Sequence, residues 1–200
     1  MRAQQPARRP PRLQGLPPVV AEGTVLLILG SFPGAASLAA AQYYAHPQNQ
    51  FWRILRALWP DTVQGVDFSD YATRCRWLLA RGLGLWDVYA SCRREGSLDA
   101  DIRDAQVNDF AGLRARLPQL RAIAHNGSES FRHHRPVRAA LGLTADERAA
   151  GADGRDAPEM ASHRLPSSSP ANASWSFERK CAAWAEVMQA AGLLSNHASP

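Results

Sequence analysis

Hydrophobic residues along the chain form two kinds of pattern, short unbroken runs and runs with helical spacing. The clearest unbroken run, residues 24–29 (TVLLIL), stops at Gly30 and is typical of a strand buried on both faces of a sheet. Three further runs predict central strands at residues 83–89, 120–125 and roughly 162–166.

Runs with helical spacing lie between these strands. Apolar residues from Phe51 to Leu58 share one helix face, and Pro60 ends that helix. Three more helices are predicted: over about residues 71–82, after the capping residue Asn108, and over about residues 175–191 after the capping residue Ser174. Strands that alternate with helices predict an α/β fold built on a mostly parallel sheet.

Two stretches lack either pattern. Residues 1–21 hold five prolines and four arginines and predict a flexible arm, while residues 141–159 predict a polar surface excursion. The expected organisation is therefore an N-terminal arm over residues 1–21, a single domain over residues 22–193 and a C-terminal tail over residues 194–200.

Composition narrows the class of protein. The chain is 46% hydrophobic and 20% charged, which excludes a wholly disordered protein. It has no apolar run of about 18 residues and no signal-peptide pattern, so neither a membrane protein nor a secreted one is expected. Its three cysteines are odd in number and far apart, which argues against a disulfide framework and indicates the cytoplasm.

The net charge of +5 is concentrated at the N-terminus. Residues 1–21 hold four of the 23 basic residues and none of the 18 acidic ones, so the rest of the chain is almost neutral. A basic arm on a neutral body is compatible with nucleic-acid binding but does not demand it.

Candidate chemistry gathers where the predicted strands end, which is where open parallel sheets bind ligands. The turn Gly30-Ser31-Phe32-Pro33-Gly34 can bring backbone N–H groups close to a ligand, or it can be a plain turn. Asp87 ends the second predicted strand, and it can act on a ligand or simply cap a turn.

Two further segments are rich in polar side chains. In residues 42–52, Phe51 fits the core and Asn49 can cap the following helix, whereas Tyr43 and Tyr44 are not both expected in the core. The loop over residues 165–174 (LPSSSPANAS) offers hydroxyl and N–H groups for phosphate contacts, or it is a rigid polar loop. It contains no Gly-x-Ser-x-Gly nucleophile motif.

Four stretches together resemble the uracil-DNA glycosylase superfamily, and within it the hypoxanthine (deoxyinosine)-DNA glycosylases. They are GSFPGAASLAAAQYYAHPQNQFW (residues 30–52), GLGLWDVYASCRREGSLDADIRDAQVNDF (82–110), AIAHNG (122–127) and LPSSSPANASWSFE (165–178). The resemblance implies three layers, αβα, with a central four-stranded, mostly parallel sheet.

The resemblance also implies a role for each candidate residue. It gives Asn49 and Ser31 catalytic roles, in which they position the attacking water. It assigns the base pocket to Gly30, Phe32, Pro33, Gly34, Tyr44, Asp87 and Asn126, with Tyr44 stacking on the extruded base and Asp87 reading its edge. DNA contacts are assigned to Ser167, Ser168, Ser169, Asn172 and Ser174.

Two positions depart from the wider superfamily pattern. Phe32 stands where many members have Asp or Asn, and Leu165 stands where many have His. Both departures are similar to the hypoxanthine branch and argue against strong uracil excision. His125 occupies a position where an apolar residue is expected.

The function that follows is a monofunctional DNA glycosylase that excises a deaminated purine, hypoxanthine from deoxyinosine, by hydrolysis of the N-glycosidic bond. It is expected to act on DNA containing the deaminated base as a monomer, with no metal and no cofactor. A lyase step is not expected because Lys180, the only lysine, is placed away from the predicted site. The alternatives are a uracil or xanthine glycosylase, and a lesion-binding protein that flips bases without cutting.

Overall fold

A computed structural model describes residues 10–142 and 161–195 of the chain. Its centre is a four-stranded parallel sheet in the order β3-β2-β6-β7. The strands are β2 (Leu26–Gly30), β3 (Leu83–Asp87), β6 (Ala122–Asn126) and β7 (Ala161–Leu165). This sheet confirms the predicted α/β class and all four predicted central strands.

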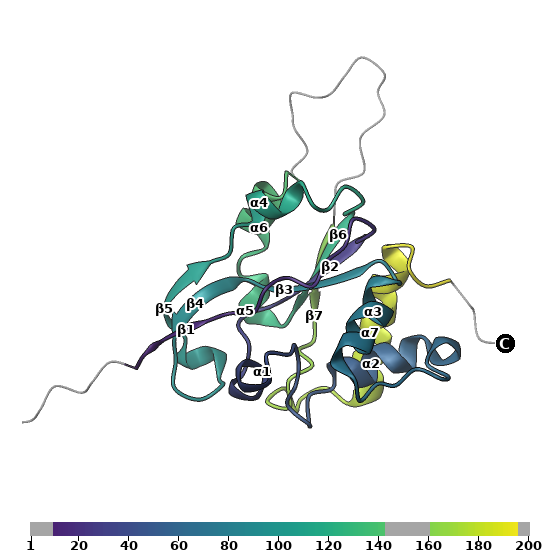
Figure 1. Ribbon diagram of the computed structural model, residues 1–200, viewed down its shortest axis with the longest axis horizontal. Coiled ribbons are helices and arrows are strands. Elements are labelled where there is room, and N and C mark those ends of the chain that lie inside the picture. Colours follow the sequence, from purple (N-terminus) through teal and green to yellow (C-terminus); the bar gives the residue numbers. More distant parts are fainter. Residues whose placement is uncertain (1–9, 143–160, 196–200) are drawn as a thin grey trace, which may run out of the picture.

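Helices cover the sheet on both sides (Figure 1). One group consists of α2 (Phe51–Leu58), α3 (Tyr71–Leu79) and α7 (Phe177–Ala190), and the other of α4 (Phe110–Arg114), α5 (Ser128–Phe131) and α6 (His134–Ala140). The short helix α1 (Ala35–Ala40) follows β2 at the carboxyl end of the sheet, and single 3-10 turns occur at Pro60–Thr62 and Asp99–Asp101. The result is the expected three-layer arrangement.

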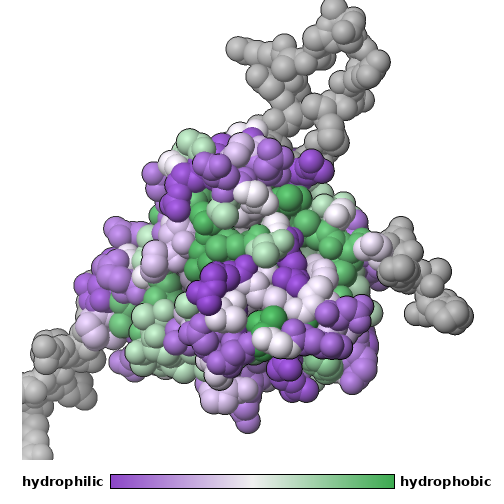
Figure 2. Space-filling view, turned by 45° about the vertical axis from the view of Figure 1, so that its right-hand side comes forward, coloured by the Kyte–Doolittle hydropathy of each residue, from purple (hydrophilic) through white to green (hydrophobic). Residues whose placement is uncertain are grey.

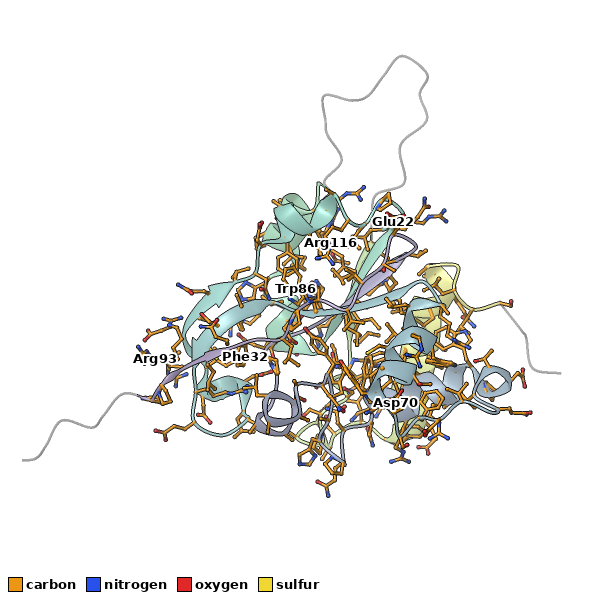
Figure 3. All side chains as sticks on the ribbon, in the orientation of Figure 1. Glu22, Phe32, Asp70, Trp86, Arg93 and Arg116 are labelled. Atoms are coloured by element: carbon orange, nitrogen blue, oxygen red, sulfur yellow. The ribbon has the colours of Figure 1, made fainter. Side chains whose placement is uncertain are left out.

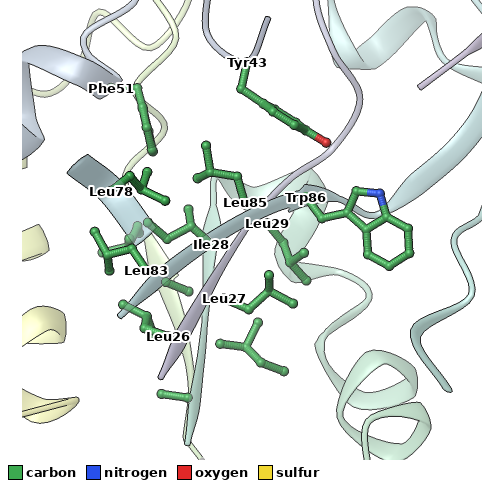
Figure 4. Packing of buried hydrophobic residues seen from close by; sticks show 14 of the residues in the cluster. Leu26, Leu27, Ile28, Leu29, Tyr43, Phe51, Leu78, Leu83, Leu85 and Trp86 are labelled. Atoms are coloured by element: carbon green, nitrogen blue, oxygen red, sulfur yellow. The ribbon is translucent and has the colours of Figure 1, made fainter. Parts of the chain in front are cut away.

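The core forms because β2 is apolar on both faces. Leu26, Leu27, Ile28 and Leu29 have no exposed surface, and successive side chains point to opposite sides of the sheet (Figure 4). Each such side chain contributes on the order of 1.5–3 kcal/mol when fully buried. Phe51 of α2 and Leu78 of α3 pack against this core from the helix side.

The helix caps differ from the predicted ones. Asp109, not Asn108, caps α4 by accepting a 2.9 Å hydrogen bond from Gly112 N, while Asn108 Nδ2 donates to the carbonyl of Asp87. Ser176, not Ser174, caps α7. In each case the segment holds two residues able to cap, and tertiary contacts select between them.

A second sheet was not predicted. It is antiparallel, in the order β1-β4-β5, and consists of β1 (Arg12–Gln14), β4 (Tyr89–Arg93) and β5 (Arg103–Val107). The predicted strand at residues 83–89 therefore divides near Val88 between two sheets. Exposed large hydrophobic side chains in the described residues are Leu98 and Val107, both in the β4–β5 hairpin. Elsewhere, Figure 2 shows apolar surface as a band across the middle of one face, between polar regions.

The predicted arm is wrong for the described residues before Glu22. Arg12–Gln14 pairs with β4, Val19 forms a bridge with Leu85, and the Tyr43 hydroxyl lies 3.2 Å from the carbonyl oxygens of Leu16 and Pro17. Proline favours extended backbone, which an edge segment can use without losing a ladder hydrogen bond. Residues 1–9 lie outside the described residues.

Two other predicted boundaries can be compared in part. In the predicted surface excursion, Leu141 is fully buried, and residues 143–159 lie outside the described residues. At the predicted C-terminal tail, Leu194 packs against the core.

Removing residues 10–21 should destabilise the domain. Leu13, Leu16, Val19 and Val20 are partly buried against the core, so their loss should lower the free energy of unfolding by on the order of 2–5 kcal/mol. Urea unfolding of a chain that starts at residue 22, against one that starts at residue 10, measures the difference. Equal midpoints would mean that this segment is a dispensable arm after all.

No helix in residues 10–142 and 161–195 is both long and apolar enough to cross a membrane.

Candidate active site

The candidate site lies at the carboxyl ends of the parallel strands. The segment between α1 and α2 and the loop between β7 and α7 meet there, at the lower edge in Figure 1. Gln50 N donates a 2.9 Å hydrogen bond to Ser168 O, which joins the two segments. Most of the predicted site residues are thereby brought to one edge of the sheet.

Gly30 and Asp87 end neighbouring strands and are paired in register. A Cβ atom on residue 30 would lie only 2.3 Å from Asp87 Oδ1 and 3.5 Å from the Tyr44 hydroxyl. Any other residue at position 30 would thus displace the Asp87 carboxyl. Gly30 is required here for the close approach of these side chains rather than for an unusual backbone angle.

Asp87 is a buried carboxyl, with 4% of its surface exposed and no hydrogen bond to Oδ2 from the described residues. Burial raises its pKa to about 8, repulsion from Asp99 adds to the rise, and Arg94 opposes it. Asp87 is therefore mostly protonated at neutral pH and can donate a hydrogen bond.

The turn after β2 is held by residues 94–102. Ser31 Oγ donates a 2.6 Å hydrogen bond to Asp99 Oδ1, Arg94 Nη2 donates to Pro33 O, and the Arg94 guanidinium lies 5.2 Å from the centre of the Phe32 ring. Phe32 and Pro33 are buried, while Gly34 precedes α1. The structure places Ser31 beside a carboxylate, and its hydroxyl is already engaged.

Tyr44 lies beside Asp87 and Asn126. Its ring stacks on Phe51 with a centroid distance of 3.9 Å and an interplanar angle of 15°. Its buried hydroxyl lies within hydrogen-bonding geometry of no partner in the described part of the chain. Burial, followed by the nearby Asp87 charge, raises the pKa of Tyr44, and the adjacent Asn126 amide opposes the rise. A base can stack only on the ring face opposite Phe51.

Tyr43, in contrast, belongs to the core. Its side chain is 3% exposed, and its backbone carbonyl accepts a 3.1 Å hydrogen bond from Trp52 Nε1. His125 is also a core residue, since it is fully buried with Nδ1 2.9 Å from Ser130 Oγ. Burial lowers the pKa of His125 to about 4, so it is neutral. Of the two adjacent tyrosines, Tyr44 is the one that reaches the site.

Asn49 is half-buried at the start of α2. Its Oδ1 atom accepts a 3.0 Å hydrogen bond from Phe51 N, and its backbone N–H donates to His46 O. This is the local turn chemistry of an Asn before a helix. The amide oxygen retains a second lone pair, so this bond is compatible with a role in orienting water.

Asn126 ties the end of β6 to the loop after β7. Its Oδ1 atom accepts a 2.8 Å hydrogen bond from Ser168 N, and its Nδ2 atom donates to Ser168 Oγ at 2.9 Å. Ser168 is fully buried. The structure therefore gives Asn126 and Ser168 a positioning contact with each other.

The remaining polar residues of this loop mainly bond within it. Ser167 Oγ accepts from Ser169 N, Asn172 Nδ2 donates to Ser167 O, and Ser174 Oγ donates to Asn172 Oδ1. These bonds order the loop, and the Ser167 hydroxyl, which accepts in its bond, keeps its own hydrogen for donation.

Lys180 lies nearer the site than predicted. Its Nζ atom donates hydrogen bonds to Gln50 Oε1 at 2.8 Å and to Asn172 O at 3.0 Å, and the side chain is 1% exposed. The prediction that Lys180 lies away from the site is wrong, because the first turn of α7 packs beside the start of α2. Gln50 follows the predicted catalytic residue Asn49, and Asn172 is itself a predicted DNA contact.

The sequence prediction also missed Arg94 and Asp99, which surround Asp87 and Ser31. Both lie in the resembling stretch over residues 82–110, shortly after a predicted strand. Charged residues at that place in the sequence could have been predicted to reach the site. The part of the chain that the structure describes contains no group of three or more His, Cys, Asp or Glu side chains able to hold a metal ion.

Similarity to known proteins covers most of the chain. Residues 17–191 match the model of the Uracil DNA glycosylase superfamily. A protein named hypoxanthine DNA glycosylase from Methanosarcina barkeri is 40% identical over 129 residues, which are 64% of this chain and 79% of that protein. A protein of the same name from Methanosarcina acetivorans is 39% identical over 58% of this chain and 72% of its own length.

A more distant relative is the G/U mismatch-specific uracil DNA glycosylase of Schizosaccharomyces pombe, 31% identical over 52% of this chain and 30% of that protein. Among solved structures, an NMR structure of a candidate uracil DNA glycosylase from Methanosarcina acetivorans superposes with a TM-score of 0.69 at 32% identity. The superposition covers 90% of this chain and 99% of that one. On sequence and fold together, this chain belongs to the uracil DNA glycosylase superfamily.

Proposed function

We propose that this protein is a DNA glycosylase that hydrolyses the N-glycosidic bond of deoxyinosine in DNA and releases hypoxanthine. The observation that carries the proposal is the buried Asp87 carboxyl at the end of β3, beside Gly30 and Tyr44, where burial raises its pKa to about 8. The two hypoxanthine DNA glycosylases from Methanosarcina species, at 40% and 39% identity, support the same substrate.

A protonated carboxyl suits a purine leaving group. Cleavage of the C1′–N9 bond leaves the bonding electron pair on the base and positive charge on the sugar. Asp87 can donate its proton to an acceptor such as N7 of hypoxanthine, so that the base departs neutral. Water adds to C1′ and releases a proton to solvent, which yields the abasic sugar, and a proton taken from solvent restores Asp87.

The other site residues bind the extruded base and position the attacking water. Extruding the nucleotide from the duplex costs a few kcal/mol, and stacking on Tyr44 can return about 1–3 kcal/mol of it. Asn49 cannot deprotonate water, but its amide oxygen can hold a water molecule against C1′. Gly30 lets the Asp87 carboxyl and the Tyr44 hydroxyl approach the end of β2 because it has no side chain.

Hydrolysis without a lyase step remains part of the proposal. The Lys180 Nζ atom is held by hydrogen bonds to Gln50 and Asn172, which opposes its use as a nucleophile on the sugar. Borohydride should therefore trap no covalent complex between the protein and deoxyinosine DNA. A trapped complex that disappears in Lys180→Met would make the enzyme bifunctional.

Uracil excision is the second candidate, favoured by the similarity to the uracil DNA glycosylase of Schizosaccharomyces pombe. Duplexes that each carry one deoxyinosine, deoxyuridine or deoxyxanthosine, assayed under single turnover for abasic sites, separate these substrates. Fastest cleavage of the deoxyinosine duplex is expected. Fastest cleavage of another lesion would change the substrate, and tight binding without cleavage of any would make the protein a lesion-binding protein.

Tyr44→Ala should weaken binding to lesion DNA by about 1–3 kcal/mol, because it removes the surface on which the base stacks. Tyr44→Phe should bind like the wild type, because the hydroxyl has no geometric hydrogen-bond partner in the described residues. Fluorescence anisotropy with a non-cleavable deoxyinosine analogue measures both. Equal losses in the two variants would point to the hydroxyl, rather than the ring, as the contacting group.

A further inference from the structure

An open cavity of about 650 Å³ lies between the start of α2 and the start of α7. Polar and charged side chains line much of it, among them Gln48, Gln50, Arg53, Asn172, Trp175 and Lys180. Gln48 and Gln50 flank Asn49 in sequence, and Asn172 belongs to the loop after β7. The cavity therefore adjoins the candidate active site from the side of α7.

Lys180 is a buried cation in this cavity wall without a carboxylate partner among the described residues. Its ammonium has three donors, of which two bind the neutral oxygens of Gln50 and Asn172. Burial lowers the pKa of Lys180, which reflects the cost of keeping the charge there. A buried charge with only neutral partners is stabilised by an anion placed next to it.

Arg53 provides a second positive charge in the same wall. Its guanidinium lies 4.7 Å from the centre of the Phe177 ring, and the side chain is exposed. No acidic residue is among the residues that line the cavity. Glu178 lies in the first turn of α7, but it is fully exposed and is not part of the lining. Both charges that face this cavity are therefore positive.

From this arrangement we propose that the cavity binds a backbone phosphate of the DNA, with Lys180 and Arg53 as its cationic contacts. The identity of the anion as a DNA phosphate rests on the proposed function. Asn172 and Ser174 donate hydrogen bonds within their own loop and carry no charge, so they offer less to a phosphate than these two cations. Lys180 also fixes Gln50 and Asn172, which places the phosphate contact beside Asn49.

The salt dependence of DNA binding tests this proposal. Each lost phosphate contact should reduce the slope of log Kd against log salt by about 0.9. Raising the salt from 50 to 200 mM weakens DNA binding by a certain factor in the wild type. In Arg53→Met and in Lys180→Met that factor should be about 3-fold smaller. Lys180→Arg should retain the wild-type slope. Arg116→Met is the matched control, because Arg116 is exposed at the opposite end of the molecule (Figure 3).

Thermal unfolding distinguishes loss of a contact from loss of the fold. If Lys180→Met does not fold, the salt dependence of the exposed Arg53→Met variant tests the proposal by itself. Wild-type slopes in every folded variant of Arg53 and Lys180 would overturn the proposal, as would an equal reduction in Arg116→Met. The excision assay of the wild type on deoxyinosine tests the proposed function separately. The phosphate site and the glycosylase function can therefore be refuted independently of each other.

Discussion

Asn49→Ala should reduce single-turnover excision of hypoxanthine by about 100-fold or more while lesion-DNA binding changes only a few-fold. The physical reason is that the amide oxygen orients the attacking water and makes no large contribution to binding. Quenched-flow excision and anisotropy titration, on the same duplex, measure the two effects. The expected result is thus a loss in rate without a matching loss in affinity.

The structure supplies a competing account, because Asn49 Oδ1 accepts a hydrogen bond from Phe51 N. Loss of that bond should lower the stability of Asn49→Ala by about 1 kcal/mol. Asn49→Asp keeps an oxygen for Phe51 N and serves as the control for this structural role. If Asn49→Ala loses stability but excises at the wild-type rate, Asn49 only orders the turn before α2.

The central sheet was predictable because its signal is local. The run before Gly30 is apolar at every position, and a strand buried on both faces requires that pattern. The apolar stripe from Phe51 to Leu58 gave α2 in the same way. Such elements can be predicted because their own residues carry the periodicity.

The antiparallel sheet has no such signal. All five residues of Arg103–Val107 are exposed, so this strand is defined by hydrogen bonds to β4 and not by an apolar face. Arg12–Gln14 is similar, since the prolines and arginines of residues 1–21 around it predict an arm, and its pairing requires β4. Edge strands depend on a partner that the local sequence does not reveal.

Some contacts of the candidate site could be predicted from the sequence, and others could not. The pairing of Gly30 with Asp87 follows from two parallel strands that end together, so it could be expected from the strand predictions. The contact between Lys180 and Gln50 joins residues 130 positions apart, and no local pattern encodes it. The charge environment of Asp87, with Asp99 and Arg94, likewise depends on how residues 94–102 fold over the turn after β2.

Asp87 should give excision a pH dependence centred on its raised pKa. Because burial raises that pKa to about 8, the carboxyl carries a proton at neutral pH and loses it above pH 8. Single-turnover excision should therefore fall as pH rises through about 8. Asp87→Asn should be slower by about 10²–10⁴-fold, and its rate should be flat over the same range because an amide cannot donate a proton to the base.

Stability should also fall as pH rises, over the range between the unfolded and folded pKa values of Asp87. The unfolded chain releases the Asp87 proton near the ordinary value of 3.8, whereas the folded protein holds it to about 8. Between these values the folded state binds more protons, so the free energy of unfolding contributed by this group falls as pH rises. Asp87→Asn should therefore be more stable than the wild type near pH 8, by on the order of a few kcal/mol at most.

Asp99→Asn provides the control for this assignment. The Asp99 charge is the second cause of the raised pKa of Asp87, so its removal should move the midpoint of the excision profile to lower pH. Urea unfolding and single-turnover excision across pH 6 to 9, on the three proteins, measure both effects. A wild-type profile that stays flat through pH 8, or an Asp87→Asn variant that excises at the wild-type rate, would remove Asp87 as the acid. The leaving purine would then have to depart with only hydrogen bonds to stabilise its charge.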